Sequence, residues 1–244
     1  MGALAMSVLT ACRTNAGAAV LIGNTTISEA QIDKAVAGLP SGVAGTTADA
    51  RNFLTSIKAF NEVARRLAKD KNYGSVTPTS ADITSLGAQL KLDPAASAKN
   101  EFVLDYAQAV EWRTLLLSKM PDKAPTEAGL MEAFANLTNQ QAFQAGTTYA
   151  QAKPTIATQI PGLGQAIELQ SELEATAKTY DITVNPRYFP ACSHAPCGAL
   201  SFPVFEFTPP GGSQQFEILF LQMGESASPA VLDSPAPPQP AATN

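Results

Sequence analysis

The stretch from Ala18 to Leu39 reads AAVLIGNTTISEAQIDKAVAGL, and it outlines the beginning of the fold. Its apolar first part ends at Gly23-Asn24, which predicts a short strand followed by a turn. Ser28 and Gln31 have the spacing of a capping box, so a helix is expected to begin at this point. The chain therefore opens with a strand that leads into a short helix.

Apolar residues at intervals of three and four predict further helices along the middle of the chain. The expected segments are residues 48–71, a short helix headed by Thr79 and Asp82, one long helix over 94–120, a helix capped by Thr126, and a kinked stretch that ends at Tyr180 and is interrupted at Pro154 and at Pro161-Gly162. Most of the chain is thus expected to be helical.

Aromatic residues recur at helical spacing within these segments, namely Phe53, Phe60, Phe102, Tyr106 and Phe134. Residues of this kind usually form the core, and each is expected to be buried. A groove that binds another chain would instead need some of them partly exposed. Their spacing alone does not separate the two cases.

Two later segments have extended rather than helical periodicity. Residues 181–184 (DITV) predict a strand that pairs with Val20-Leu21-Ile22 and brings the two ends of the helical region together. Residues 200–207 and 216–222 flank Pro209-Pro210-Gly211-Gly212, which is typical of a β-hairpin. Because its apolar residues stand at consecutive positions, one face of the hairpin is expected to dock on the helical body or to offer an edge to another chain.

The fold class predicted from these elements is α+β, mainly α. It consists of a multi-helix domain closed by a small β-sheet, with a C-terminal β-hairpin. The chain has 244 residues, of which 45% are hydrophobic and 15% are charged, with a formal net charge of −5 and one His. A sizeable core is therefore possible, and the acidic balance argues against nucleic acid as a partner.

A short apolar run ends in Leu9-Thr10-Ala11-Cys12, the pattern that closes the export signal of a bacterial lipoprotein. Small residues before a thiol allow cleavage in front of Cys12, followed by acylation of its sulfur and of the new amino terminus. Residues 1–12 are therefore predicted to be a partial lipoprotein signal segment, with Cys12 as the lipidation site. No later run approaches the roughly 20 apolar residues of a membrane span. The alternative is an apolar tail that ends in a free Cys.

Cys192 and Cys197 remain once Cys12 is assigned. A pair at close spacing suits a disulfide in an oxidising compartment. His194 lies between them, so the alternative is a zinc or copper site, although only three ligands are local. We expect the disulfide, and neither a metal nor a cofactor.

The sequence contains no assembled catalytic motif. It has a single His and neither Ser-x-x-Lys nor Gly-x-Ser-x-Gly, and Gly162-Leu163-Gly164 follows no predicted strand. Lys153, Lys178 and the pair Arg65-Arg66 are expected to be solvated helix faces, with a shared ligand role as the alternative. The chain is therefore expected not to be an enzyme.

Three segments stand in a characteristic order behind the lipoprotein signal: VLIGNTTISEAQIDKAVAGL (Val20 to Leu39), PTEAGLMEAFANL (Pro125 to Leu137) and DITVNPRY (Asp181 to Tyr188). In this order they resemble the SurA-like N-terminal chaperone domain of extracytoplasmic folding factors, particularly the lipoprotein forms of high-GC Gram-positive bacteria. The resemblance spans about residues 18–188 and implies a helical domain that binds unfolded polypeptides. After Tyr188 the chain departs from the family, because a Cys pair and a hairpin follow.

Proteins of this family can carry a parvulin prolyl isomerase domain, inserted after the helix that resembles residues 130–137. Here the corresponding gap covers only residues 138–148. An independent domain needs on the order of 50 residues or more, so no isomerase domain fits there. The resemblance therefore implies a binding module without its catalytic partner.

The chain is expected to have four parts: residues 1–12 as the signal segment, 13–188 as the SurA N-terminal-like helical domain, 189–223 as a Cys-containing hairpin extension, and 224–244 as a disordered tail rich in Pro, Ser and Ala. The expected function is the holding of unfolded or secreted polypeptides on the extracytoplasmic face of the cell membrane, without nucleotide.

Two alternatives to this function come from other classes. They are a structural or assembly lipoprotein with one dedicated protein partner, and an enzyme with an unrecognised site. A broad apolar groove favours a chaperone, one flat complementary patch favours a dedicated partner, and a closed pocket with perturbed acid or base groups favours an enzyme.

Overall fold

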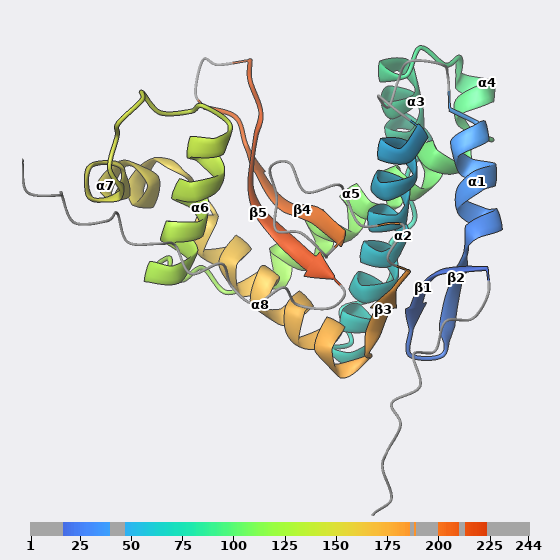
Figure 1. Cartoon of the computed structure of the whole chain (residues 1–244), viewed down its shortest axis with the longest axis horizontal. Helices are drawn as coiled ribbons and strands as arrows, with labels where there is room; N and C mark the ends of the chain where they lie inside the picture. The colour runs from blue at the N-terminus through green and yellow to red at the C-terminus, as the bar shows by residue number, and fades with distance from the viewer. Residues whose placement is uncertain (1–16, 40–46, 186–187, 189–199, 210–212, 224–244) are drawn as a thin grey trace, which may run out of the picture.

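The computed structural model describes residues 17–39, 47–185, 188, 200–209 and 213–223. Its elements follow in the order β1 (Ala18–Ile22), β2 (Thr25–Ser28), α1 (Glu29–Ala37), α2 (Thr47–Asp70), α3 (Ser80–Gln89), α4 (Pro94–Ser97), α5 (Glu101–Lys119), α6 (Glu127–Asn139), α7 (Tyr149–Gln159), α8 (Leu163–Thr179), β3 (Ile182–Val184), β4 (Leu200–Phe207) and β5 (Phe216–Met223). Helices dominate, and the strands form two small antiparallel sheets (Figure 1). The predicted class, α+β and mainly α, is confirmed.

The first sheet has the strand order β2-β1-β3. β1 and β3 pair in the register Val20↔Val184 and Ile22↔Ile182, which confirms that the two ends of the helical region meet. β2 is not among the predicted strands. It returns along β1 after a tight turn at Gly23-Asn24, where Gly23 has a φ of +55° that favours glycine.

Capping hydrogen bonds confirm the three predicted helix N-termini, at Ser28, Thr79 and Thr126. The Ser28 hydroxyl accepts from the N–H of Gln31 at 3.2 Å, and the Gln31 side chain accepts from the N–H of Ser28 at 2.8 Å. The Thr79 and Thr126 hydroxyls likewise accept from backbone N–H groups in the first turns of α3 and α6. Each cap satisfies N–H groups that have no partner inside the helix.

The prediction of one long helix over residues 94–120 is wrong, because the structure divides it into α4 and α5. Asn100 has an extended backbone, with φ −82° and ψ 114°, and its side chain caps α5 by accepting from the N–H of Val103 at 3.2 Å. The Asn100 amide also donates to the carbonyl of Gly38 at 2.7 Å. A contact with the distant end of α1 therefore stabilises the break.

Only one of the two interruptions expected before Tyr180 is present. α7 continues through Pro154, whose exposed ring costs this helix one backbone hydrogen bond. The chain breaks at Pro161-Gly162, where Gly162 has a φ of +78° and precedes α8.

α2 forms the centre of the larger hydrophobic core. One face of this helix is fully buried, at Leu54, Ile57, Phe60, Val63, Ala64 and Leu67. It packs against α1, α5, α8 and β4, so elements from both ends of the chain meet on it.

The hairpin of β4 and β5 lies between two groups of helices (Figure 1). In β4, Phe202 and Val204 belong to the core around α2, and the ring of Phe202 stacks on that of Phe60 with centroids 4.2 Å apart. In β5, Ile218 and Leu219 belong to a second core with α6, α7 and α8. The prediction that the hairpin docks on the helical body is confirmed, and the hairpin joins the two cores.

Side chains from α6 and α8 cover the outer edge of β5. Asn136 donates to the carbonyl of Ile218 at 2.8 Å, and Gln170 donates to the carbonyl of Phe220 at 2.9 Å. Gln140 makes two hydrogen bonds with the backbone of Glu217, at 2.6 Å and 3.0 Å. These side chains occupy groups that an added strand would need, so this edge is not offered to another chain.

Candidate functional site

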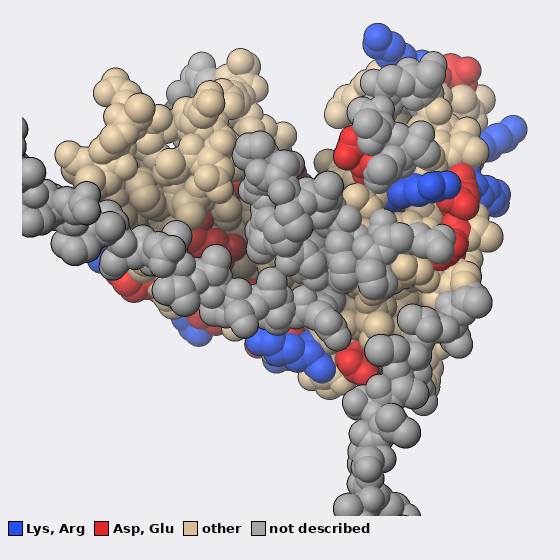
Figure 2. Space-filling view, in the orientation of Figure 1, with Lys and Arg blue, Asp and Glu red and all other residues tan. Residues whose placement is uncertain are grey.

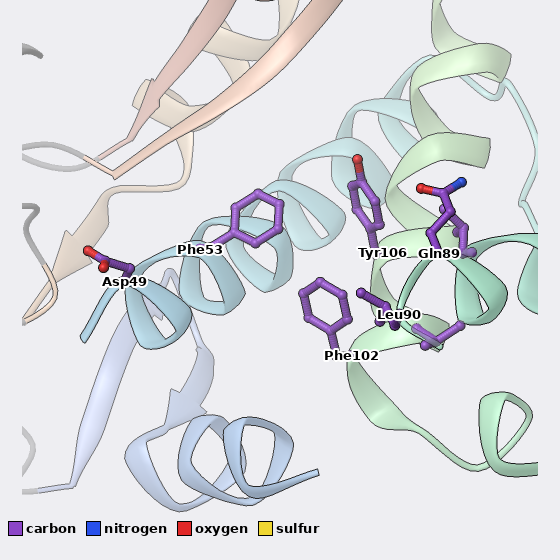
Figure 3. Close-up of a pocket in the computed structure, with 8 residues that line it drawn as sticks. Asp49, Phe53, Gln89, Leu90, Phe102 and Tyr106 are labelled. Atoms are coloured by element: carbon purple, nitrogen blue, oxygen red, sulfur yellow. The ribbon is translucent and has the colours of Figure 1, made fainter. Parts of the chain in front are cut away.

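An apolar groove lies between α2, α3 and α5, and we call it the aromatic groove. Its volume is about 380 Å³, within the range of ligand-binding pockets. It is lined by Asp49, Phe53, Leu86, Gln89, Leu90, Phe102, Val103 and Tyr106. Figure 3 shows the aromatic side chains gathered from α2 and α5, with α3 beside them.

Three rings form the apolar surface of the aromatic groove. The ring centroids of Phe53, Phe102 and Tyr106 are 5.8–5.9 Å from one another, which is a favourable spacing for aromatic contacts. Phe102 is buried and Tyr106 is half-buried, whereas Phe53 is 37% exposed. The exposed ring of Phe53 therefore rests on one buried ring and one half-buried ring.

Phe53 is less covered than the apolar residues that follow it in α2. Further along α2, Ile57 and Phe60 lie under α5 and β4 and are completely buried. Phe53 meets α5 at the rings of Phe102 and Tyr106, which cover only part of its own ring. The expectation that every aromatic residue of the set is core is confirmed for Phe60 and Phe102 and is wrong for Phe53.

An ion-pair cluster links α2 to α5 beside the aromatic groove. Lys58 Nζ lies 2.6 Å from Asp105 Oδ2 and 3.0 Å from Glu101 Oε1. Burial of Lys58 opposes its charge, but the hydrogen bonds with Asp105 and Glu101 outweigh this effect and raise its pKa. Lys58 therefore stays charged and ties α2 to α5 at the level of the groove.

Tyr106 is the ionisable residue that lies deepest in the groove. Burial raises the pKa of its hydroxyl, and the negative charge of Glu206 raises it further, so the group stays protonated at neutral pH. A protonated phenol held among rings is suited to contact and hydrogen bonding.

The sequence singled out Cys12, Cys192, Cys197 and His194, all of which lie outside the described residues. Their predicted lipidation, disulfide and alternative metal roles therefore stay predictions. Within the ranges that the structure describes, no group of three or more His, Cys, Asp or Glu side chains could hold a metal ion.

The cations expected on solvated faces have different environments. Lys153 pairs with Glu127 at the surface, at 2.5 Å. Arg66 is not a solvated residue, because only 12% of its side chain is exposed; it pairs with Glu62, donates to the carbonyl of Ile22 and lies over the ring of Tyr180. It ties α2 to the first sheet, so its role is structural.

Comparison of the chain with protein-family models, with curated proteins and with solved structures finds no match. In the part of the chain that the structure describes, no helix is long and apolar enough to cross a membrane. Function is therefore inferred from the aromatic groove and its surroundings.

Proposed function

We propose that this chain is a membrane-anchored extracytoplasmic lipoprotein that holds unfolded or secreted polypeptides, and that the aromatic groove receives their apolar side chains. The observation that carries the proposal is the exposed ring of Phe53 within an apolar groove of about 380 Å³. Large apolar side chains exposed in a hollow are typical of surfaces that bind other chains.

The energetics of such a groove suit reversible holding. Burying one large apolar side chain contributes about 1.5–3 kcal/mol. This amounts to roughly ten- to a hundredfold in affinity at about 1.4 kcal/mol for each factor of ten. A single contact is therefore weak and tolerant of sequence, and an unfolded chain with several apolar residues can rebind before it diffuses away. No nucleotide is needed for release.

Three features are consistent with the proposed relation to the SurA-like N-terminal domain. They are the strand and capping box at its start, the helix capped by Thr126 and the pairing of β3 with β1. The connection between α6, which ends at Asn139, and α7, which begins at Tyr149, is far shorter than an isomerase domain of roughly 50 residues or more. The proposed function is accordingly non-enzymatic.

An aggregation assay tests the holding function. The chain should slow aggregation of several unrelated unfolded proteins at near-stoichiometric ratio, with or without ATP, and should not accelerate cis/trans isomerisation of a proline peptide. Phe53→Ser should lose most of this protection. Met131→Ser is the matched control, because Met131, 46% exposed, is the other large apolar side chain at the surface of the described residues and lies on α6.

Two results would count against the holding function. Lack of protection of every unfolded substrate, together with tight binding to one native protein, would favour the alternative of a dedicated assembly lipoprotein. Equal protection by the Phe53→Ser and Met131→Ser variants would show that clients bind elsewhere.

Membrane attachment needs its own experiment. In the native host, Cys12→Ser should release the protein from the membrane fraction, because a thiol is required for acylation. A Cys12→Ser variant that still sediments with membranes after a high-salt wash would overturn the lipoprotein assignment.

A further inference from the structure

The hairpin carries an acidic pair, with one residue on each strand. Glu206 in β4 and Glu217 in β5 are directly opposite each other in the strand register. Like charges at paired positions of neighbouring strands destabilise a sheet. Arg113 of α5 pairs with Glu206, and it stands two helical turns after Tyr106, which lines the aromatic groove. The acidic pair and the groove therefore lie along the same helix, about two turns apart.

Arg113 is the cation next to these two carboxylates, and it pairs with Glu206. Arg113 Nη2 lies 2.7 Å from Glu206 Oε2, and both side chains are largely buried. Gln215 donates to the same Glu206 oxygen at 2.8 Å. The solvent-accessible side chain of Glu217 makes no hydrogen bond or ion pair with any residue that the structure describes. The cluster has two negative charges and one positive charge.

The excess negative charge of the cluster affects the carboxyl group of Glu217. Desolvation raises the pKa of its carboxyl, Glu206 raises it further, and Arg113 only partly opposes the effect. A second cation beside Glu217 would remove the imbalance. Figure 2 shows a notch between the part of the molecule built on α6 and α7 and the part built on α2 and α3.

We propose that the aromatic groove and Glu217 together select polypeptide segments in which a large apolar residue is followed or preceded, at short distance, by Lys or Arg. The apolar side chain enters the groove at Phe53, and the cation pairs with Glu217. This inference rests on the proposed holding function and specifies its substrate class.

The spacing follows from α5. Tyr106 and Arg113 are two helical turns apart on one face of this helix, which corresponds to about 10 Å along its axis at roughly 1.5 Å per residue. An extended peptide covers about 10 Å in three residues. Arg113 marks the position of the acidic pair along α5, because it pairs with Glu206 and Glu206 lies opposite Glu217. The preferred cation therefore lies about three residues from the apolar residue, and the flexible side chain of Lys or Arg tolerates one residue either way.

Fluorescence anisotropy with labelled peptides tests the selection. Three peptides share a Gly/Ser frame and one Phe, and differ only in having Lys, Gln or Glu three residues from that Phe. At low salt the native chain should bind the Lys peptide about threefold more tightly than the Gln peptide, as expected for one ion pair of up to about 1 kcal/mol. The Glu peptide should bind more weakly than both, and salt should reduce the differences.

Variants of the chain separate the contribution of the Glu217 charge to binding from that of the aromatic groove. Glu217→Gln should abolish the preference for Lys over Gln and leave the affinity for the Gln peptide within about twofold; the variant removes a repulsion, so it is expected to fold. Asp122→Asn, a loss of charge in the connection between α5 and α6, should keep the preference. Phe53→Ser should weaken binding of all three peptides.

The outcomes distinguish this inference from the proposed function. Equal binding of the Lys and Gln peptides, or an unchanged preference in Glu217→Gln, would overturn the charge selection while the groove stands. Absence of binding of every peptide would overturn the holding function as well. Sedimentation that shows a dimer dissociated by Phe53→Ser would assign the groove to a second copy of the chain and overturn both.

Discussion

Replacement of Phe202 by alanine tests whether the hairpin is part of the cooperative core. Phe202 is 1% exposed, and its ring stacks on the fully buried ring of Phe60 with an interplanar angle of 23°. Phe→Ala in a core costs about 3–5 kcal/mol, and an aromatic pair adds about 0.5–1.5 kcal/mol beyond its buried area. We therefore expect Phe202→Ala to lower the free energy of unfolding by about 4 kcal/mol, a large part of the roughly 5–15 kcal/mol of a whole domain.

Urea denaturation measures this loss. Trp112 is the single Trp of the chain and is 3% exposed on α5, so its fluorescence reports the core around α2. With a slope of about 2.5 kcal/mol per molar urea, the midpoint should fall by roughly 1.5 M. The fluorescence transition should coincide with that of far-UV circular dichroism, as for a two-state domain.

Two variants control the Phe202 experiment. Phe202→Leu keeps the apolar contact and should cost only about 1–1.5 kcal/mol. Met131→Ala removes a side chain that is 46% exposed and should change stability by less than about 0.5 kcal/mol. A loss below about 1 kcal/mol for Phe202→Ala, or a separate hairpin transition, would refute the idea that β4 completes the core.

Three further predictions address other contacts. Gly164→Ala should cost about 1–2 kcal/mol in urea denaturation, because its methyl group would overlap the carbonyl oxygen of Lys123, and a more stable variant would contradict this close approach. Gln140→Ala should speed amide hydrogen exchange at Glu217 and cost about 1 kcal/mol; unchanged exchange would show that the β5 edge is protected otherwise. Burial opposes ionisation of Glu62, but hydrogen bonds from the two arginines one turn later in α2 hold its pKa below the ordinary value, so its stabilisation is present above about pH 4.5 and is lost as the pH falls through the lowered pKa. In urea titrations at several pH values, Glu62→Gln should lose less stability on acidification than the native chain, and parallel curves would contradict this.

The sequence by itself determined the local elements. Capping residues such as Ser28 and Thr126 act on N–H groups within the next turn, so their effect can be predicted from a few neighbouring residues. The strand at residues 182–184 and the hairpin strands were also predictable, because their periodicity differs from that of the helices around them. Even the aromatic residues of the groove could be named, although not their exposure.

Only the tertiary structure decided which of these residues are covered. Phe53 and Phe60 share a helical spacing, yet one is exposed and the other buried, because the ring of Phe202 in β4 stacks on Phe60 whereas Phe53 is covered only in part, by Phe102 and Tyr106. Leu86 and Leu90 enter the groove because α3 packs beside α5, and the break at Asn100 depends on a hydrogen bond to Gly38. The burial of a residue depends on segments that are far away in the chain. The spacing of neighbouring residues does not show which of these segments will pack against it.

The same reason applies to the hairpin and to its charges. Apolar residues in β4 and β5 predicted docking, but the position between two helical cores depends on shapes that exist only after α2, α6 and α8 have assembled. Glu206 and Glu217 are separated along the chain and become neighbours through strand register, and Arg113 joins them from α5. An electrostatic site of this kind forms only when residues that are distant in the chain come close together in the folded protein.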